Sequence, residues 1–158
     1  MHDEFGSVIE EAITLELNVS DLYFLFYKLF PDDSEFWWKL AMEEQNHAAL
    51  LKTVKQMSRS ELQLPKEIVP SGRNELATSN KKLLQALEDF ENYPDRTKAF
   101  QFALEIENSA GELHYQSFMK YGTESRLLNV FRKLNGDDIN HADRIRQYMN
   151  QHNIPEAV

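Results

Sequence analysis

The sequence predicts an all-α protein: an antiparallel four-helix bundle with a long crossover that carries an extra helix. Apolar residues recur at alternating three- and four-residue spacing over several long stretches, which is typical of helices that pack along a seam. Turn signals such as Pro31, Pro94 and Gly122 separate these stretches. The two halves of the chain also match one another position by position, which indicates a duplicated helical hairpin.

The composition limits both the class of protein and its chemistry. A chain of 158 residues, 42% of them hydrophobic, is long and apolar enough to form one globular domain. Its net charge of −9 argues against nucleic acid or an anionic membrane surface as a partner. Because there is no cysteine, any bound metal must have oxygen and nitrogen ligands. The N-terminus lacks a secretory pattern and no apolar run is long enough to span a membrane, so we expect a cytoplasmic protein.

The first two helices are expected over residues 4–30 and 34–58. Glu16 is the one acidic residue in the main apolar row of the first helix. Pro31 ends that helix, and the acidic and hydroxyl residues at 32–34 favour the N-cap of the next one. Because the link is short, the two helices should be antiparallel neighbours.

A longer linker follows. Residues 59–93 contain proline and glycine around a shorter amphipathic helix, which is expected over residues 74–90. Its apolar side is expected to consist of Leu76, Leu83, Leu84 and Leu87. Two more long helices are expected over residues 95–121 and 124–150.

Asn135-Gly136 is a turn signal inside the last helix, where glycine costs about 1 kcal/mol relative to alanine. One interpretation ends a helix at Leu134 and restarts it at Asp137. The other retains one helix and has Gly136 and Gly111 make room near a site for a substrate or a bulky neighbour. We favour the second, because the apolar spacing keeps its phase across the glycine.

The second helix places two polar side chains in its buried seam. This seam runs from Trp37 to Val54 and includes Glu44 and His47. The three-residue step between them puts a carboxylate and an imidazole side by side on one face. An unpaired buried carboxylate costs several kcal/mol, so a proton, an ion pair or a metal ion must neutralise it.

The third and fourth helices repeat this arrangement. Residues 12–16, which end in Glu16, match residues 103–107, which end in Glu107. The segment from Trp37 to His47 matches that from Phe131 to His141, with Asp138 at the position of Glu44. The duplicated unit is therefore a hairpin with one acid on its first helix and an acid–histidine pair on its second.

If four antiparallel helices of similar length pack side by side, residues near their midpoints share one layer. Six ligand-type side chains would then meet in the bundle centre: Glu16, Glu44, His47, Glu107, Asp138 and His141. Two divalent cations would balance the four carboxylates, and carboxylate with imidazole suits iron or manganese. In the alternative, the two histidines are hydrogen-bonded to Glu44 and Asp138 without a metal.

At these positions the chain resembles the rubrerythrin-like branch of the ferritin-like di-iron carboxylate family. That family has one Glu on helices one and three, and Glu-x-x-His on helices two and four. The resemblance covers nearly the whole chain and implies two iron ions, with manganese or zinc as the other candidates. It further implies terminal ligands Glu16 and Glu107, bridging acids Glu44 and Asp138, and one histidine ligand per metal, His47 and His141.

Three features depart from the family pattern. Asp138 stands where the family has Glu, and Ala110 occupies the position of a second Glu on the third helix. The sequence contains no rubredoxin domain, so we expect electrons to come from a separate protein.

Other side chains near the centre have expected supporting roles. Tyr23 follows Glu16, and His114 follows Glu107, at the same spacing. Both are expected to donate hydrogen bonds to a ligand carboxylate, and a direct ligand role is the alternative for His114. Three acids off the seams are expected to be solvated or ion-paired: Glu43, Glu105 and Glu112.

The resemblance implies an oxidoreductase in which two ferrous ions pass electrons to dioxygen or hydrogen peroxide. Such an enzyme would need an external electron donor. There are two alternatives: a protein that stores or buffers iron or manganese without turnover, and a helical interaction module whose metal site has decayed. The resemblance also implies a homodimer or larger assembly, with Trp38 either at a dimer contact or partly exposed.

Overall fold

A computed structural model describes residues 4–57, 72–119 and 126–158, with the side chains of 6–57, 73–109, 129–130 and 132–158. These parts of the chain are all-helical, which confirms the predicted all-α class. The elements are α1 (Glu4–Leu29), the 3-10 helix η1 (Pro31–Asp33), α2 (Ser34–Lys55), α4 (Gly72–Asn92), α5 (Arg96–Met119) and α6 (Arg126–Gln151).

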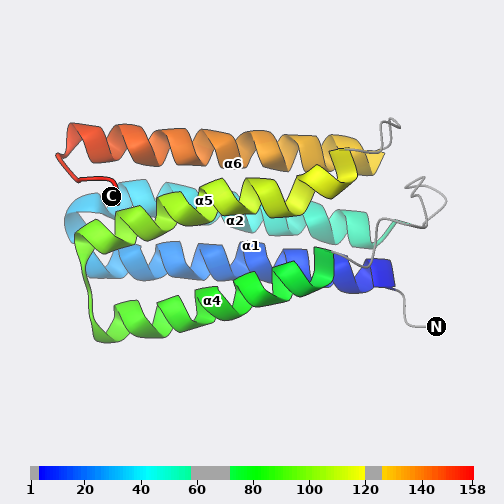
Figure 1. Ribbon diagram of the computed structural model, residues 1–158, viewed down its shortest axis with the longest axis horizontal. Helices are drawn as coiled ribbons and strands as arrows, with labels where there is room; N and C mark the ends of the chain where they lie inside the picture. The colour runs from blue at the N-terminus through cyan, green and yellow to red at the C-terminus, as the bar shows by residue number, and fades with distance from the viewer. Residues whose placement is uncertain (1–3, 58–71, 120–125) are drawn as a thin grey trace.

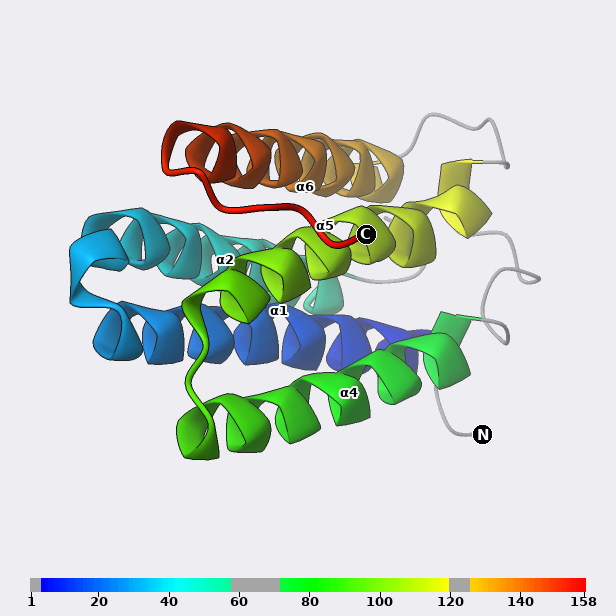
Figure 2. The same ribbon diagram turned by 60° about the vertical axis from the view of Figure 1, so that its left-hand side comes forward.

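Four long helices form two antiparallel hairpins that lie side by side (Figure 1). Helices α1 and α2 make one hairpin and α5 and α6 make the other, with the extensive contacts that such hairpins require. Helix α4 lies outside these four, packed mainly on α1 and to a lesser extent on α5 (Figure 2). Within the described residues, no helix combines the length and apolar character needed to cross a bilayer.

The turn between α1 and α2 is tied to the other hairpin. Asp33 stands at the N-cap position of α2 but makes no capping hydrogen bond. Its carboxylate instead accepts two hydrogen bonds from Arg96, at 2.7 and 2.8 Å, and one of 2.8 Å from the Tyr148 hydroxyl. Burial raises the pKa of Asp33, but these hydrogen bonds and the Arg96 charge outweigh it, so the pKa lies below its ordinary value. Asp33, one of the three residues predicted to supply the cap, therefore joins α2 to α5 and α6.

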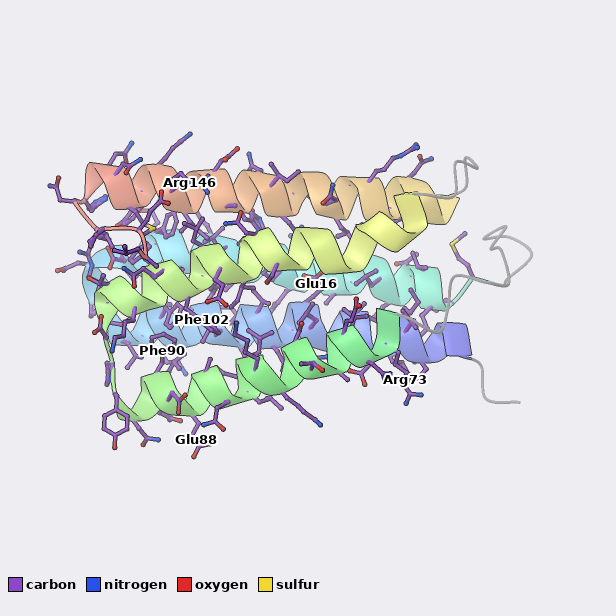
Figure 3. The ribbon with its side chains drawn as sticks, in the orientation of Figure 1. Glu16, Arg73, Glu88, Phe90, Phe102 and Arg146 are labelled. Atoms are coloured by element: carbon purple, nitrogen blue, oxygen red, sulfur yellow. The ribbon has the colours of Figure 1, made fainter. Side chains whose placement is uncertain are left out.

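Helix α4 is held on α1 by apolar packing and one buried amide pair. The Asn18 side chain donates to Asn80 Oδ1 at 3.0 Å, and Asn80 donates to the Glu11 carbonyl oxygen at 3.1 Å. Phe90 of α4 and Phe102 of α5 point toward one another, with ring centroids 5.8 Å apart (Figure 3). The expected apolar side of this helix was partly wrong, because Leu84 is 56% exposed.

Helix α6 runs without interruption through Asn135-Gly136, which confirms the single-helix interpretation. A Cβ atom built on Gly136 would have no neighbouring atom within 4 Å, and the residue is exposed. The expectation that Gly136 makes room for a packed neighbour is therefore wrong. The surroundings of Gly111 lie outside the described part of the chain.

Replacing Gly136 with alanine should stabilise the protein. The added methyl group meets open space, and alanine reduces the backbone entropy that a helix interior loses on folding. We expect Gly136→Ala to raise the free energy of unfolding by about 0.5–1 kcal/mol, measured by urea denaturation. A lower free energy of unfolding would contradict the open surroundings of this residue.

Arg96 should contribute more to stability than its exposure suggests. Its side chain is 40% exposed, as Arg146 is at 39%, but Arg96 pairs with a buried carboxylate and Arg146 with exposed ones. We expect Arg96→Met to lower the free energy of unfolding by about 2 kcal/mol at pH 7, and Arg146→Met by less than about 1 kcal/mol.

Because the pKa of Asp33 is lowered on folding, its stabilisation is present above the ordinary carboxyl pKa. That stabilisation is lost as the pH falls through the lowered value. The difference between wild type and Arg96→Met should therefore shrink in acid, as urea denaturation over a pH series would show. Equal effects of the two arginine substitutions at pH 7 would contradict this assignment.

Candidate metal centre

The six side chains that the sequence singled out come together in the middle of the bundle. They extend from α1, α2, α5 and α6, and all are at most 5% exposed. Figure 3 shows Glu16 among the helices, near the midpoint of the bundle. The members are Glu16, Glu44, His47, Glu107, Asp138 and His141. They form two overlapping groups, and within each group the ligand atoms all lie within 4.8 Å of one another.

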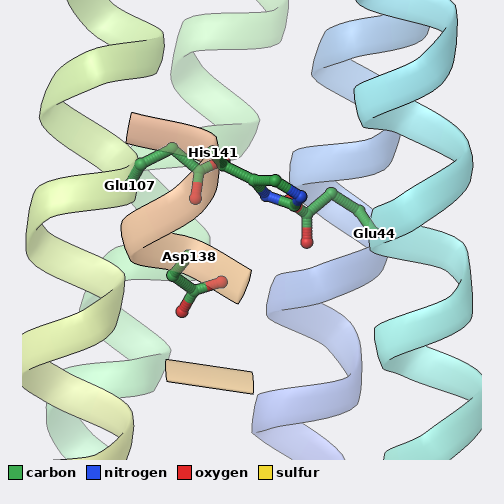
Figure 4. A group of neighbouring side chains, drawn as sticks. All are labelled: Glu44, Glu107, Asp138 and His141. Atoms are coloured by element: carbon green, nitrogen blue, oxygen red, sulfur yellow. The ribbon is translucent and has the colours of Figure 1, made fainter. Parts of the chain in front are cut away.

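The larger group joins Glu44, Glu107, Asp138 and His141 (Figure 4). The His141 ring lies between the carboxylates of Glu44 and Glu107, and Asp138 lies one helical turn away on the same helix. His141 Nδ1 is 2.8 Å from Glu44 Oε1 and 3.5 Å from Glu107 Oε1. Three helices thus supply four ligand-type atoms around one point, which could hold a metal ion.

The smaller group consists of Glu16, Glu44 and His47. His47 Nδ1 is 3.0 Å from Glu44 Oε2 and 3.6 Å from Glu16 Oε2. Glu44 belongs to both groups, because its two carboxylate oxygens face different histidines. This group could also hold a metal ion, and one carboxylate would then lie between the two positions.

Three buried atoms of the larger group have no hydrogen-bond partner among the described residues: Glu44 Oε1, Asp138 Oδ2 and His141 Nδ1. Glu44 Oε1 and His141 Nδ1 are 2.8 Å apart, but their orientation is not that of a hydrogen bond. A buried polar atom without a partner costs about 1–3 kcal/mol, and more when it is charged. Atoms that converge without bonding to one another are suited to a cation placed between them, so the donor set fits a metal ion.

The carboxylates dominate the electrostatics of the two histidines. Burial lowers the pKa of His47, but its contacts with Glu16 and Glu44 outweigh this and raise the pKa to about 11. The same balance at His141, with Glu107 and Glu44 as partners, raises its pKa to about 12. Burial, followed by the charges of Glu16 and Glu107, raises the pKa of Asp138 well above its ordinary value. Protons therefore carry the balancing positive charge when no other cation does.

Each histidine also meets an acid at its outer nitrogen. His141 Nε2 is 2.6 Å from Glu43 Oε2, and His47 Nε2 is 3.2 Å from Asp137 Oδ2. The two acids occupy equivalent positions in the repeat, each directly before the acid of an acid-x-x-His step. An acid on Nε2 fixes the ring and leaves Nδ1 directed at the cluster.

Sequence reasoning did not find these two contacts. Glu43 was expected to be solvated or ion-paired, and it is paired with Arg144 at 2.7 Å as well as with His141. Asp137 was not singled out, although it is held by Lys133 at 2.6 Å. Their equivalence in the repeat was the signal that could have identified both.

Tyr23 contacts the cluster through Glu107. Its hydroxyl donates a hydrogen bond of 2.5 Å to Glu107 Oε1, and the side chain is fully buried. Burial and the Glu107 charge raise the pKa of Tyr23 well above its ordinary value, which keeps the hydroxyl protonated as a donor. Tyr23 thus connects the first hairpin to a carboxylate of the second.

The remaining residues singled out near the centre are one exposed acid and three residues whose side chains the structure does not describe. Glu105 is exposed and pairs with Lys82, as expected for an acid off the seam. The side chains of His114 and Glu112 lie outside the described part of the chain, as does that of Ala110.

Comparisons with models of protein families, with curated proteins and with solved structures found no match. The resemblance to rubrerythrin-like proteins therefore rests on the sequence pattern alone.

The raised histidine pKa values predict how metal-free protein responds to alkali. A pKa raised on folding contributes stability that is fully present below the unfolded value, near 6.5, and is lost as the pH rises toward the folded value. For His47 and His141 the folded values are about 11 and about 12. Chelator-treated protein should therefore lose stability steadily from pH 7 to pH 10.

The control for this prediction is His47→Gln, which removes one of the two titrating rings. Urea denaturation of the metal-free variant should show a shallower decline over the same pH range. The same slope for variant and wild type would show that His47 is not protonated in the metal-free fold.

Proposed function

We propose that this chain binds two iron ions at its centre and uses them to react with dioxygen or hydrogen peroxide, with oxidation of ferrous iron. One observation carries the proposal: six buried acid and histidine side chains from four helices form two overlapping groups with one shared carboxylate. The runner-up metals are manganese and zinc, which accept the same ligand types.

The balance of charge at this site favours metal ions over protons as the source of positive charge. Four carboxylates in a water-poor interior are costly to ionise together, and two divalent ions would balance them. Two protonated histidines balance only two of the four carboxylates, and Asp138, whose pKa is raised, is neutral only when it binds a proton of its own. Among the described residues the buried Asp138 Oδ2 has no hydrogen-bond partner, and a cation bound beside it would supply one.

Bound ferrous iron would supply one electron per ion to dioxygen or hydrogen peroxide. The residues of this chain have separate tasks around that chemistry. Glu44 would hold both positions together, and Tyr23 would restrain Glu107 through its hydrogen bond. Glu43 and Asp137 would keep the histidine rings aligned through their outer nitrogens.

The burial of the cluster supports a small oxidant. No member of the cluster is more than 5% exposed, so bulk water and large substrates are kept from the ligand atoms. Dioxygen and hydrogen peroxide are small enough to reach such a place through side-chain fluctuations. Electrons would then have to come from a separate donor that docks outside. A cytoplasmic location and a homodimer complete the proposal and rest on the sequence alone.

A second candidate is a protein that binds iron or manganese without turnover. Asp138 favours it, because this acid belongs only to the larger group whereas Glu44 belongs to both. A centre with one shared carboxylate is held together less firmly during repeated redox cycles than one with two. Such a protein would oxidise its iron once and would need no reductase.

The proposal is tested by metal analysis followed by a turnover assay. Protein purified without added metal should contain up to two metal ions per chain, and the iron-loaded form should consume peroxide catalytically with an artificial reductant. Glu44→Gln should lose metal at both positions. The matched control, Glu105→Gln, removes an exposed acid and should leave metal content and turnover unchanged.

The outcomes separate the candidates. Two metals with a single round of oxidation would favour the storage protein, and absence of metal would overturn the proposal. Metal should also stabilise the fold by about 2.7 kcal/mol at a hundredfold excess over its dissociation constant, so a chelator should lower the melting temperature.

A further inference from the structure

We infer that the two metal positions are unequal, and that the position formed by Glu44, Glu107, Asp138 and His141 fills before the one formed by Glu16, Glu44 and His47. The inference rests on the part of the proposed function that concerns metal binding and needs no redox chemistry. It assigns the order in which the two metal positions fill. It also assigns a role to Asp138, which stands where the rubrerythrin-like pattern has Glu.

The first reason is the number of ligands. The larger group offers four ligand atoms from α2, α5 and α6, and the smaller offers three from α1 and α2. Four protein ligands complete the coordination of a tetrahedral ion, whereas three leave a place that water or another small molecule must fill. Binding at the smaller group therefore gains one protein ligand fewer.

The second reason is the length of the acid on the last helix. Glu44 and Asp138 are equivalent in the repeat, but only Glu44 belongs to both groups. The aspartate side chain is one methylene shorter, and its carboxylate groups with Glu44, Glu107 and His141 but not with His47. A glutamate at this position would have the reach to join the smaller group, so the asymmetry follows from this one residue.

The third reason is the bonding that a metal ion must replace. In the smaller group, His47 Nδ1 already has a hydrogen bond of 3.0 Å with Glu44 Oε2. In the larger group, Asp138 Oδ2 has no hydrogen-bond partner within the described residues, and His141 Nδ1 lies 2.8 Å from Glu44 Oε1 without hydrogen-bond geometry. An ion entering the larger group must displace the charge contact between His141 and Glu44 but gives Asp138 Oδ2 a partner, whereas an ion entering the smaller group must break the hydrogen bond between His47 and Glu44.

The consequence is a division of roles between the positions. The ion with four protein ligands would be the more firmly held one, bound by residues of three helices. The ion with three would keep an open coordination place, next to Glu16 and His47, where a small exogenous molecule could bind.

Isothermal titration with Zn²⁺ tests the inference without any redox step. Metal-free wild-type protein should bind two equivalents in two phases, with dissociation constants at least tenfold apart. Glu16→Gln should remove the weak phase and leave the tight one. Glu107→Gln should weaken the tight phase, and Glu105→Gln, on the same helix but exposed, should change neither. Far-UV circular dichroism checks that each variant is folded.

Asp138→Glu tests the cause of the asymmetry. The longer side chain should tighten the weak phase and bring the two dissociation constants closer together. Two equivalents of equal affinity in the wild type would overturn the inference and leave the proposed metal binding intact. Loss of the same phase in Glu16→Gln and Glu107→Gln would also overturn it. Failure to bind Zn²⁺ at all would overturn both the inference and the proposed function.

Discussion

The burial of four carboxylates at one depth of the bundle is the constraint on which the rest of the structure depends. Each of Glu16, Glu44, Glu107 and Asp138 comes from a different helix and is at most 3% exposed. Ionised carboxylates at this density repel one another and lose the hydration that they have in the unfolded chain. The fold is stable only if positive charge is placed among them, and the two histidines are the nearest source in the described residues. Apolar packing elsewhere in the bundle, including the fully buried Trp37, offsets the free-energy cost of burying these carboxylates.

The duplicated hairpin explains how the centre is organised. Each half contributes an acid from its first helix and an acid–histidine pair from its second, so the halves face one another with their ligands in register. The acid that precedes each acid–histidine pair contacts the histidine of the other hairpin. Glu43 of α2 contacts His141, and Asp137 of α6 contacts His47. The two halves are thus joined at their centre through side chains that are equivalent in the repeat. The joining is not perfectly symmetric, since Asp138 is shorter than its counterpart Glu44.

Much of this could be predicted from the sequence, because helix periodicity and repeat matching report directly on which face of each helix is buried. The six central residues followed from their positions in apolar seams, where an acid is conspicuous. The contacts of Glu43 and Asp137 could not be derived in the same way, since residues beside a seam reach the centre only through the geometry of the neighbouring hairpin. Leu84 was misplaced because the face of α4 is set by its packing against α1, including a polar pair with Asn18 and Asn80, and an apolar pattern does not reveal polar partners. The capping role expected at Asp33 gave way to Arg96 and Tyr148, which are distant in sequence.

The most direct test of the central claim is a crystal structure of protein grown with ferrous iron under anaerobic conditions, with anomalous scattering used to locate the metal. The account predicts two anomalous peaks between the helices, one near Nδ1 of His47 and one near Nδ1 of His141, with the Glu44 carboxylate between them. Peaks confined to the protein surface, or a centre occupied only by hydrogen-bonded side chains, would contradict it.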